Sequence, residues 1–264
     1  MSEAPFGTYA PGEARNLILA VIQHSKLKRG AFRPLMSRLI GAAPVDTIYQ
    51  GARFRFHHRD SATEMGALFN PEYNIGELDF LRRRLQPGST FVDVGANVGT
   101  FTLPIATHIG RDGRVIAIEP HPTAFRRLSF NAGELQFSNV TLLNCAIGEK
   151  EGQLSISTDQ ANLGACRISD SGVSVPAKTL LGVVTDSGAD RIDALKVDVE
   201  GYEDKVLMPF FRQAPRSLWP ATVAIEHLER DNWSEDCIEH MKLAGYREVT
   251  KTRSNTLLTL DQSN

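Results

Sequence analysis

Cysteine is scarce in this sequence, and its spacing matches no metal site or disulfide framework. The three cysteines are Cys145, Cys166 and Cys237, and no C-x-x-C pair occurs. Because their number is odd and their spacing uneven, we expect neither a zinc ribbon nor a disulfide-stapled fold. Free thiols are typical of a reducing compartment, so the sequence predicts a cytoplasmic protein.

Long hydrophobic runs and a surplus of charge are absent as well. No apolar stretch reaches the roughly 18 residues that a membrane-spanning helix needs, and residues 1–5 do not resemble a secretory signal, so we expect no transmembrane segment. The 29 basic and 31 acidic residues give a formal net charge of −2. This balance argues against nucleic acid as a partner, because broad nucleic-acid binding needs a basic surface.

What the sequence does contain is a strand that runs directly into a glycine-punctuated turn, in residues 90–99. The strand residues are apolar or β-branched apart from Asp93, which lies at the edge where open α/β sheets bind ligands. Glycines in such a turn let the backbone approach a ligand closely. We therefore expect a cofactor to bind over Asp93, Gly95, Ala96, Asn97 and Gly99.

Two cofactors compete for a loop of this kind. The dinucleotide fingerprint is G-x-G-x-x-G, but Asn97 and Thr100 take its second and third glycine positions here. A pyrophosphate would lose close backbone approach, and the Asp93 carboxylate would repel it. The pattern D-x-G-x-N-x-G instead matches the nucleotide loop of class I S-adenosylmethionine methyltransferases. An NAD(P)-dependent oxidoreductase and a turn with purely structural glycines remain the alternatives.

The next two predicted strands carry residues suited to a nucleoside. Residues 114–119 form a strand that ends in Glu119, and a carboxylate at that position suits the two ribose hydroxyls of an adenosine. Pro120 shapes the turn beneath the adenine. A third strand, over 140–147, should bring three more residues beside the adenine, namely Asn144, Cys145 and Ala146.

A second group of acids ends two later strands. Asp198 ends a buried strand with Glu200 just beyond it, and the strand from residue 221 ends in Glu226 and His227. Any of the four side chains could take the proton from a hydroxyl nucleophile. Alternatively, Asp198, Glu226 and His227 could hold a divalent metal that lowers the hydroxyl pKa, although no ligand spacing is diagnostic.

The strand pattern predicts the fold. Seven strands start near residues 91, 114, 140, 194, 221, 246 and 256, and most alternate with helical segments. Parallel crossovers are right-handed, so the sequence predicts an α/β fold with a doubly wound, Rossmann-like, seven-stranded sheet. We expect this sheet to be mostly parallel with an antiparallel edge.

The chain ahead of the sheet is predicted to form an N-terminal extension over residues 1–69, leaving 70–264 as the main domain. Apolar residues at helical spacing predict one or two helices over 13–40, and alternation predicts a hairpin over 45–60. Basic residues gather late in the helical segment, either as a solvated face or as a surface for an anionic substrate or a membrane. Further along, the polar stretch 158–176 is long for a compact domain, so we expect it to form a wall of the substrate site.

Several of these segments resemble FkbM-type S-adenosylmethionine-dependent methyltransferases, over roughly residues 70–230. The resemblance rests on Phe91 to Gly99, on Ile118-Glu119-Pro120 and, most specifically, on Leu195 to Glu203 with its Lys-Val-Asp-Val-Glu-Gly core. Upstream Tyr73 and Glu77, the Asn144 to Gly148 turn and Asn162-Leu163-Gly164 also fit. One departure is Thr179-Leu180-Leu181, which lacks the acid that the family usually carries there.

The resemblance implies a class I methyltransferase domain that binds S-adenosylmethionine, with Glu77 joining the cofactor site. Such proteins mostly methylate hydroxyl oxygens on sugars, polyketides and related metabolites, so we expect a small-molecule or glycan acceptor. A non-catalytic S-adenosylmethionine-binding module on the same fold is the remaining alternative. The joint presence of Asp93, Glu119, Asp198 and Glu200 argues against it, because a decayed site need not keep all four.

Overall fold

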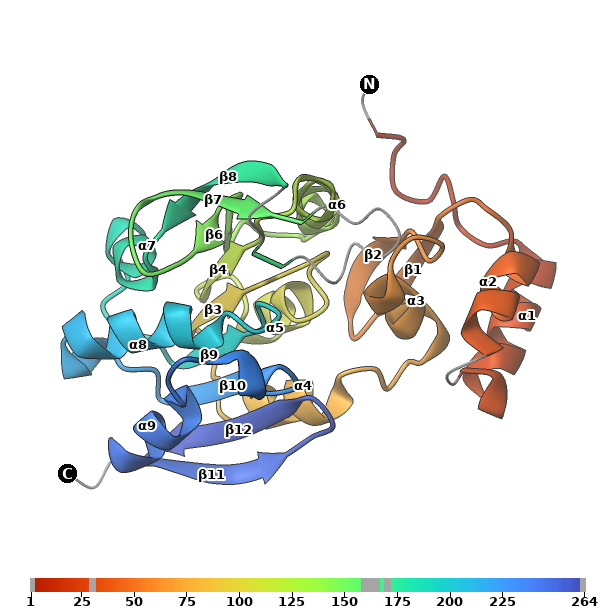
Figure 1. The fold of residues 1–264 in the computed structure, drawn as a ribbon. Coiled ribbons are helices and arrows are strands. Elements are labelled where there is room, and N and C mark those ends of the chain that lie inside the picture. The colour runs from red at the N-terminus through yellow and green to blue at the C-terminus, as the bar shows by residue number, and fades with distance from the viewer. Residues whose placement is uncertain (1–2, 29–31, 158–166, 169–171, 262–264) are drawn as a thin grey trace.

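A computed structural model describes residues 3–28, 32–157, 167–168 and 172–261. Its centre is a seven-stranded sheet, with strands in the order β11-β12-β10-β9-β3-β4-β5 (Figure 1). Three features from the sequence fall outside the described residues. They are Cys166, the Asn162-Leu163-Gly164 segment of the family resemblance and most of the expected wall at 158–176. The strand bounds are β3 Thr90–Val94, β4 Arg114–Ile118, β5 Val140–Leu143, β9 Ala194–Val197, β10 Thr222–Glu226, β11 Tyr246–Lys251 and β12 Asn255–Leu260.

The predicted seven-stranded, mostly parallel sheet with an antiparallel edge is confirmed, and the β11–β12 hairpin forms that edge. Within the sheet, β12 runs against both of its neighbours, β10 and β11. Its Leu257 and Leu258 are fully buried, whereas β11 carries Arg247 and Lys251. The more apolar strand of this hairpin thus takes the inner position, and the charged strand forms the edge.

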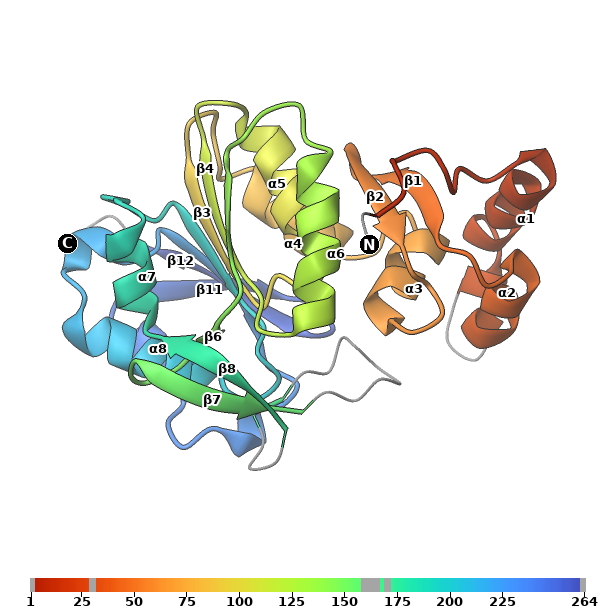
Figure 2. The same ribbon diagram turned by 90° about the horizontal axis from the view of Figure 1, so that it is seen from above.

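Helices cover both faces of the sheet, as its buried strands require (Figure 2). α4 and α5 pack on one face around Phe91 and Ala194, and α6 lies beside them. On the other face, α7, α8 and α9 pack around Val92 and Leu195. The bounds are α4 Ile75–Arg82, α5 Thr102–Ile109, α6 Pro122–Gly133, α7 Leu180–Asp186, α8 Glu203–Gln213 and α9 Cys237–Leu243, with 3-10 turns η3 Arg216–Leu218 and η4 Arg230–Asn232.

The chain reverses its direction of winding beside β3, which creates the crevice for a ligand. It passes from β3 outward to β4 and β5, and then returns to the other side of β3 through β9. The amide of Asp198 donates to the carbonyl of Val94 at 3.1 Å, so the carboxyl ends of β3 and β9 are level. In open α/β sheets, ligands bind at this reversal point.

A small second sheet closes one side of the crevice. It consists of β6 Ala146–Ile147, β7 Gly152–Ile156 and β8 Val173–Lys178, in the order β6-β8-β7. The single strand expected over 140–147 is therefore wrong, because the chain breaks after Leu143. Asn144 donates through Nδ2 to the carbonyls of Glu119 at 2.8 Å and Pro120 at 3.2 Å, which accompanies this break.

The N-terminal extension contains the predicted helices and hairpin and lies on the α5–α6 side of the sheet (Figures 1 and 2). Its Phe54 and Phe69 share one core with Val98 and Leu128 of the main domain. This core includes residues on both sides of residue 70, so a domain boundary at that position stays a prediction. The bounds are α1 Glu13–Gln23, η1 Lys26–Lys28, α2 Arg33–Ile40, β1 Val45–Tyr49, β2 Ala52–Phe56 and α3 Ala62–Phe69.

Local signals explain where three of the helices begin. Pro34 lies in the first turn of α2, where its missing N–H costs nothing, so it is compatible with the start of that helix. Helix α3, which the sequence analysis does not predict, is capped by Ser61, whose side chain accepts from the amide of Glu64. Thr179 caps the equally unpredicted α7 in the same way. Among the described residues, no helix has the length and apolarity that crossing a membrane requires.

Candidate functional site

A cavity of about 250 Å³ opens at the carboxyl edge of the sheet, where the chain reverses. The loop after β3 and the ends of β4, β9 and β10 form its floor, and β6 and β7 contribute one wall. Thr63 of α3 and Tyr73 extend it on the side of the N-terminal extension. Ten residues predicted for the site line this cavity: Gly95, Ala96, Asn97, Glu119, Pro120, Cys145, Ala146, Asp198, Glu200 and Glu226.

The glycines of the β3 loop serve packing inside the protein as much as ligand approach. Gly95 has φ +78°, and a Cβ there would lie 1.9 Å from the carbonyl oxygen of Asp198. A Cβ on Gly99 would meet the side chains of Leu103 and Leu128 at 2.3 and 2.9 Å, and Gly99 does not line the cavity. That a cofactor binds over this loop stays a prediction; neighbouring strands and helices also occupy the space that a side chain at either glycine would need.

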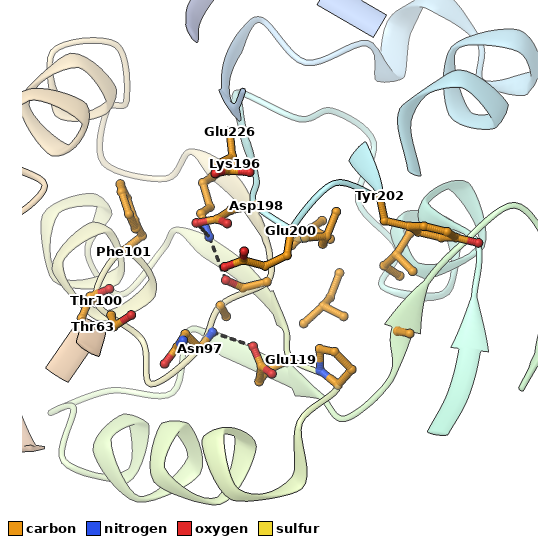
Figure 3. Close-up of a pocket in the computed structure, with 18 of the residues that line it drawn as sticks. Thr63, Asn97, Thr100, Phe101, Glu119, Lys196, Asp198, Glu200, Tyr202 and Glu226 are labelled. Carbon is orange, nitrogen blue, oxygen red and sulfur yellow. Dashed lines mark hydrogen bonds and ion pairs between the residues drawn. The ribbon is translucent and has the colours of Figure 1, made fainter. Parts of the chain in front are cut away.

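Glu119 is oriented by two backbone amides, and Figure 3 shows the hydrogen bond from Asn97. Its Oε2 accepts from the amide of Asn97 and its Oε1 from the amide of His121, both at 2.8 Å. Burial raises the pKa of Glu119 to about 7, although both hydrogen bonds favour the ionised form. Each carboxylate oxygen can accept further hydrogen bonds, so the side chain keeps acceptor capacity for hydroxyl groups in the cavity.

Asp93 lies beneath the loop and does not line the cavity, contrary to its expected contact with the cofactor. It is fully buried, accepts from Thr102 Oγ1 at 2.6 Å and lies 3.6 Å from Lys196 Nζ. Lys196 in turn donates to the carbonyl of Gly95 at 2.7 Å and lies 3.4 Å from Asp198. The carboxylate of Asp93 therefore stabilises the cation that holds the loop from below.

Lys196 is the main cavity residue that was not among the predicted site residues. It lines the cavity, although only 4% of its side chain is exposed, and its ammonium faces the Phe101 ring at 5.4 Å. The signal was present, since a lysine interrupts the otherwise apolar strand β9. A buried cation in such a strand requires anionic partners, here Asp93 and Asp198.

Carboxylates dominate one end of the cavity. Figure 3 shows Glu226, Lys196 and Asp198 grouped there, with Glu200 next to them and Glu119 with Asn97 at the opposite end. Burial, followed by the charge of Asp198, raises the pKa of Glu200 to about 7 and that of Glu226 to about 8. Glu226 Oε2 is buried and has no hydrogen-bond partner among the described residues, so this end of the cavity is suited to a cation or a proton donor.

Three other predicted residues, His227, Glu77 and Asn144, do not belong to the cavity lining. His227 Nδ1 lies 3.0 Å from Thr256 Oγ1, and burial together with nearby basic residues lowers its pKa. Glu77 accepts from Thr252 Oγ1 at 2.5 Å and so ties α4 to the β11–β12 turn. Asn144 binds carbonyls of the turn after β4, and only its neighbours Cys145 and Ala146 reach the cavity.

The metal set suggested by the sequence is not assembled. Within the described ranges, no group of three or more His, Cys, Asp or Glu side chains is placed to hold a metal ion. His227 contacts Thr256 and does not line the cavity, whereas Asp198 and Glu226 do.

Thr63 and Tyr73 bring the N-terminal side of the chain into the site. Tyr73 belongs to the family resemblance, but nothing in the sequence points to Thr63, because α3 itself is not predicted. Burial, followed by the charge of Asp198, raises the pKa of the Tyr73 phenol. Thr63 and Tyr73 can both hydrogen-bond to a ligand.

Comparison with known proteins identifies relatives of this chain. The family described as "Methyltransferase FkbM domain" matches residues 93–248. Protein-L-isoaspartate O-methyltransferase from Caenorhabditis elegans is 27% identical over 128 residues, which are 48% of this chain and 56% of that protein. The chain thus spans little more than half the length of this relative.

Two solved structures are similar at low sequence identity. Precorrin-6y C5,15-methyltransferase from Geobacter metallireducens superposes with a TM-score of 0.45 at 16% identity, covering 74% of this chain and 89% of that one. TYW2 from M. jannaschii, solved in complex with AdoMet, has a TM-score of 0.43 at 15% identity, covering 83% and 88% of the two chains. Neither likeness indicates what this chain acts on.

Proposed function

The chain belongs to the FkbM methyltransferase family, and from this premise we propose that it transfers the methyl group of S-adenosylmethionine to a hydroxyl oxygen. The proposed acceptor is a sugar, a polyketide or a related small molecule or glycan. The family match leaves no support for the NAD(P)-dependent alternative.

The residues present fit S-adenosylmethionine. We propose that Glu119 binds the ribose hydroxyls, because its orientation by two amides leaves it free to accept further hydrogen bonds. Ile118, Pro120 and Cys145 supply apolar surface beside it for a base. The buried Oε2 of Glu226, which accepts no hydrogen bond from the described part of the chain, suits the positive charge of the cofactor. When bound, S-adenosylmethionine supplies an activated methyl group, and the chain's own residues must position the acceptor and remove its proton.

The observation that carries the proposal of oxygen as the acceptor atom is the carboxylate pair Glu200 and Glu226. Their pKa values of about 7 and about 8 are close to the pH at which a general base works best. We assign proton removal to Glu200, because it is the more exposed of the two and has the pKa nearer 7. Asp198 is a weaker candidate, since Lys196 neutralises it at 3.4 Å.

The charge of the cavity supports a neutral acceptor. Among the described residues, four carboxyl groups line it, against one ammonium, that of Lys196, which already faces Asp93 and Asp198. Glu119, Glu200 and Glu226 gain charge as the pH rises through their pKa values of about 7 to 8 and would then repel a phosphate group, so we propose a small molecule or glycan and not a nucleic acid. The C. elegans relative is by its name an O-methyltransferase, which agrees with transfer to oxygen.

The test combines binding with turnover. Calorimetry with S-adenosylmethionine, its demethylated product and NAD is expected to show binding of the first two only. An acceptor screen, read by mass spectrometry for one added methyl group, then identifies the substrate class. Glu200→Gln should lower kcat by about 10²- to 10⁴-fold, with little change in cofactor affinity.

The matched control is Glu229→Gln. Glu229 pairs with Arg167, which also lies near Glu200, but it does not line the cavity. Its replacement should leave kcat within about twofold of the parent. Full turnover by a folded Glu200→Gln variant would remove the proposed role of Glu200, whereas binding of NAD alone would contradict the methyltransferase proposal itself.

A further inference from the structure

Helices α1 and α2 leave large apolar side chains exposed. On α1, Leu17 is 68% exposed and Val21 54%; on α2, Leu35 is 54% exposed and Leu39 60%. The members of each pair are four residues apart, so they lie on one face of their helix. Among the described residues, six of the ten exposed large hydrophobic side chains lie between residues 17 and 39: Leu17, Ile18, Val21, Phe32, Leu35 and Leu39.

These exposed side chains are not the ones that pack the two helices against the rest of the protein. The opposite faces of α1 and α2 already fill the core of the N-terminal extension, through Leu19 and Ile22 on α1 and Met36 and Ile40 on α2. Both helices lie at the end of the molecule farthest from the sheet (Figures 1 and 2). Exposed apolar faces of this extent mark an interaction surface.

The same segment is strongly basic. Residues 13–40 contain six basic residues and one acid, Glu13, although the whole chain has a formal net charge of −2. Lys26 and Arg38 are exposed, and Arg38 is the immediate neighbour of the exposed Leu39. Apolar and cationic groups are thus combined on α1, α2 and the η1 turn that follows α1, a combination typical of helices that lie on an anionic lipid surface.

We propose that the α1–α2 face, formed by Leu17, Ile18, Val21, Leu35, Leu39, Lys26 and Arg38, docks onto an anionic lipid bilayer. The apolar side chains would enter the boundary between headgroups and acyl chains, and the basic side chains would contact anionic headgroups. A second copy of the chain is the other candidate for this face. A two-fold symmetric dimer is disfavoured, because it would bring the same basic residues of both copies together.

Vesicle flotation at low ionic strength tests the proposal with the full chain. We expect the protein to float with vesicles that contain phosphatidylglycerol and phosphatidylcholine, and to stay unbound with phosphatidylcholine alone. Leu17→Gln combined with Leu39→Gln should reduce the bound fraction at least about tenfold, because two apolar side chains no longer insert. Arg38→Gln should weaken binding about fivefold.

The matched control is Leu243→Gln. Leu243 is 91% exposed but lies on α9, away from this face, so its replacement should not change flotation. All the replaced side chains are exposed, so circular dichroism and cofactor affinity should match those of the parent.

Three results would overturn the proposal. They are equal flotation with both kinds of vesicle, no flotation with either, and a lipid-free dimer in light scattering that Leu39→Gln dissociates. The last result would assign the face to a second copy of the chain. Each result leaves the methyltransferase proposal standing, because none of these residues lines the cavity.

Discussion

Two backbone amides fix the Glu119 carboxylate before any ligand binds. In Glu119→Gln, one carboxylate oxygen becomes an NH₂ group that faces either the Asn97 or the His121 amide. Two donors would then oppose each other in a buried place, and an acceptor for the ribose would be lost. We expect cofactor affinity to fall by roughly 10- to 100-fold, corresponding to about 1–3 kcal/mol.

Calorimetry with S-adenosylmethionine measures this change. Glu134→Gln is the control, since Glu134 makes only a surface ion pair with Arg53 at 3.6 Å and should not affect binding. Parent-like affinity in Glu119→Gln would contradict the assignment of Glu119 to the ribose.

Glu226 should make cofactor binding depend on pH. Burial raises its pKa to about 8, so the side chain is largely protonated at pH 7 and gains its charge only as the pH rises through 8. Affinity for the cationic S-adenosylmethionine should therefore increase between about pH 7 and pH 9, whereas affinity for the demethylated product, which lacks the sulfonium charge, should change much less.

Calorimetry with both ligands across this pH range is the measurement, and Glu226→Gln is the comparison. The variant carries no charge at this position, so the ratio of the two affinities should become nearly independent of pH. A ratio that rises equally in parent and variant would assign the effect to another group.

The sequence could predict acids that end strands, but not which of them face the cavity. Glu119, Glu200 and Glu226 line it as expected. Asp93 and His227 do not, because Thr102 and Thr256, from other elements, bind their side chains. Such partners are set by tertiary packing, which a pattern within one segment does not contain.

At the scale of elements, the loop after β3 is packed against the end of β9. Gly95→Ala combines a positive φ with a Cβ 1.9 Å from the carbonyl of Asp198. Gly110→Ala is a matched control, because Gly110 also has a positive φ, +73°, but its Cβ would meet nothing within 4 Å. We expect Gly110→Ala to lower the free energy of unfolding by about 1 kcal/mol, and Gly95→Ala to lower it by several times as much.

Urea unfolding of both variants separates the cost of a positive φ, which both variants share, from the cost of the steric clash, which only Gly95→Ala has. Equal losses would mean that the loop can move away from β9 at little cost. If Gly95→Ala is the costlier variant, as expected, the glycine is required by the contact between two strand ends.

Periodicity predicted the strands well, because buried β-branched runs depend little on their neighbours. It failed where an element owes its existence to a cap or to a tertiary partner. Ser61 and Thr179 cap the unpredicted helices α3 and α7. The order of β11 and β12 depends on which hairpin strand is the more apolar, a comparison that lies between segments and not within either.

At the scale of the whole molecule, buried polar contacts attach the N-terminal extension to the main domain. Arg127 of α6 pairs with Glu64 of α3 at 2.5 Å and with Asp60 at 2.8 Å. Asn131 of α6 accepts from the amide of Arg55 and donates to the carbonyl of Val98. These contacts fix α3, which carries Thr63, to the cavity side of the sheet.

Arg127→Met should break this attachment. Glu64 is fully buried, so removal of its cation leaves an unpaired carboxylate in the core and should cost about 3–5 kcal/mol of the free energy of unfolding. Arg212→Met, which removes a surface ion pair with Glu235, should cost less than about 1 kcal/mol in the same urea experiment.

The double variant Arg127→Met/Glu64→Leu distinguishes charge from shape. If the loss comes from the unpaired carboxylate, replacing both partners by apolar side chains should restore most of the stability, since a buried ion pair and a well-packed apolar pair are often comparable. If the double variant is as unstable as Arg127→Met, the guanidinium acts through its remaining contact with Asp60. Restored stability with weakened cofactor binding would show that the ion pair also sets the position of α3 at the cavity.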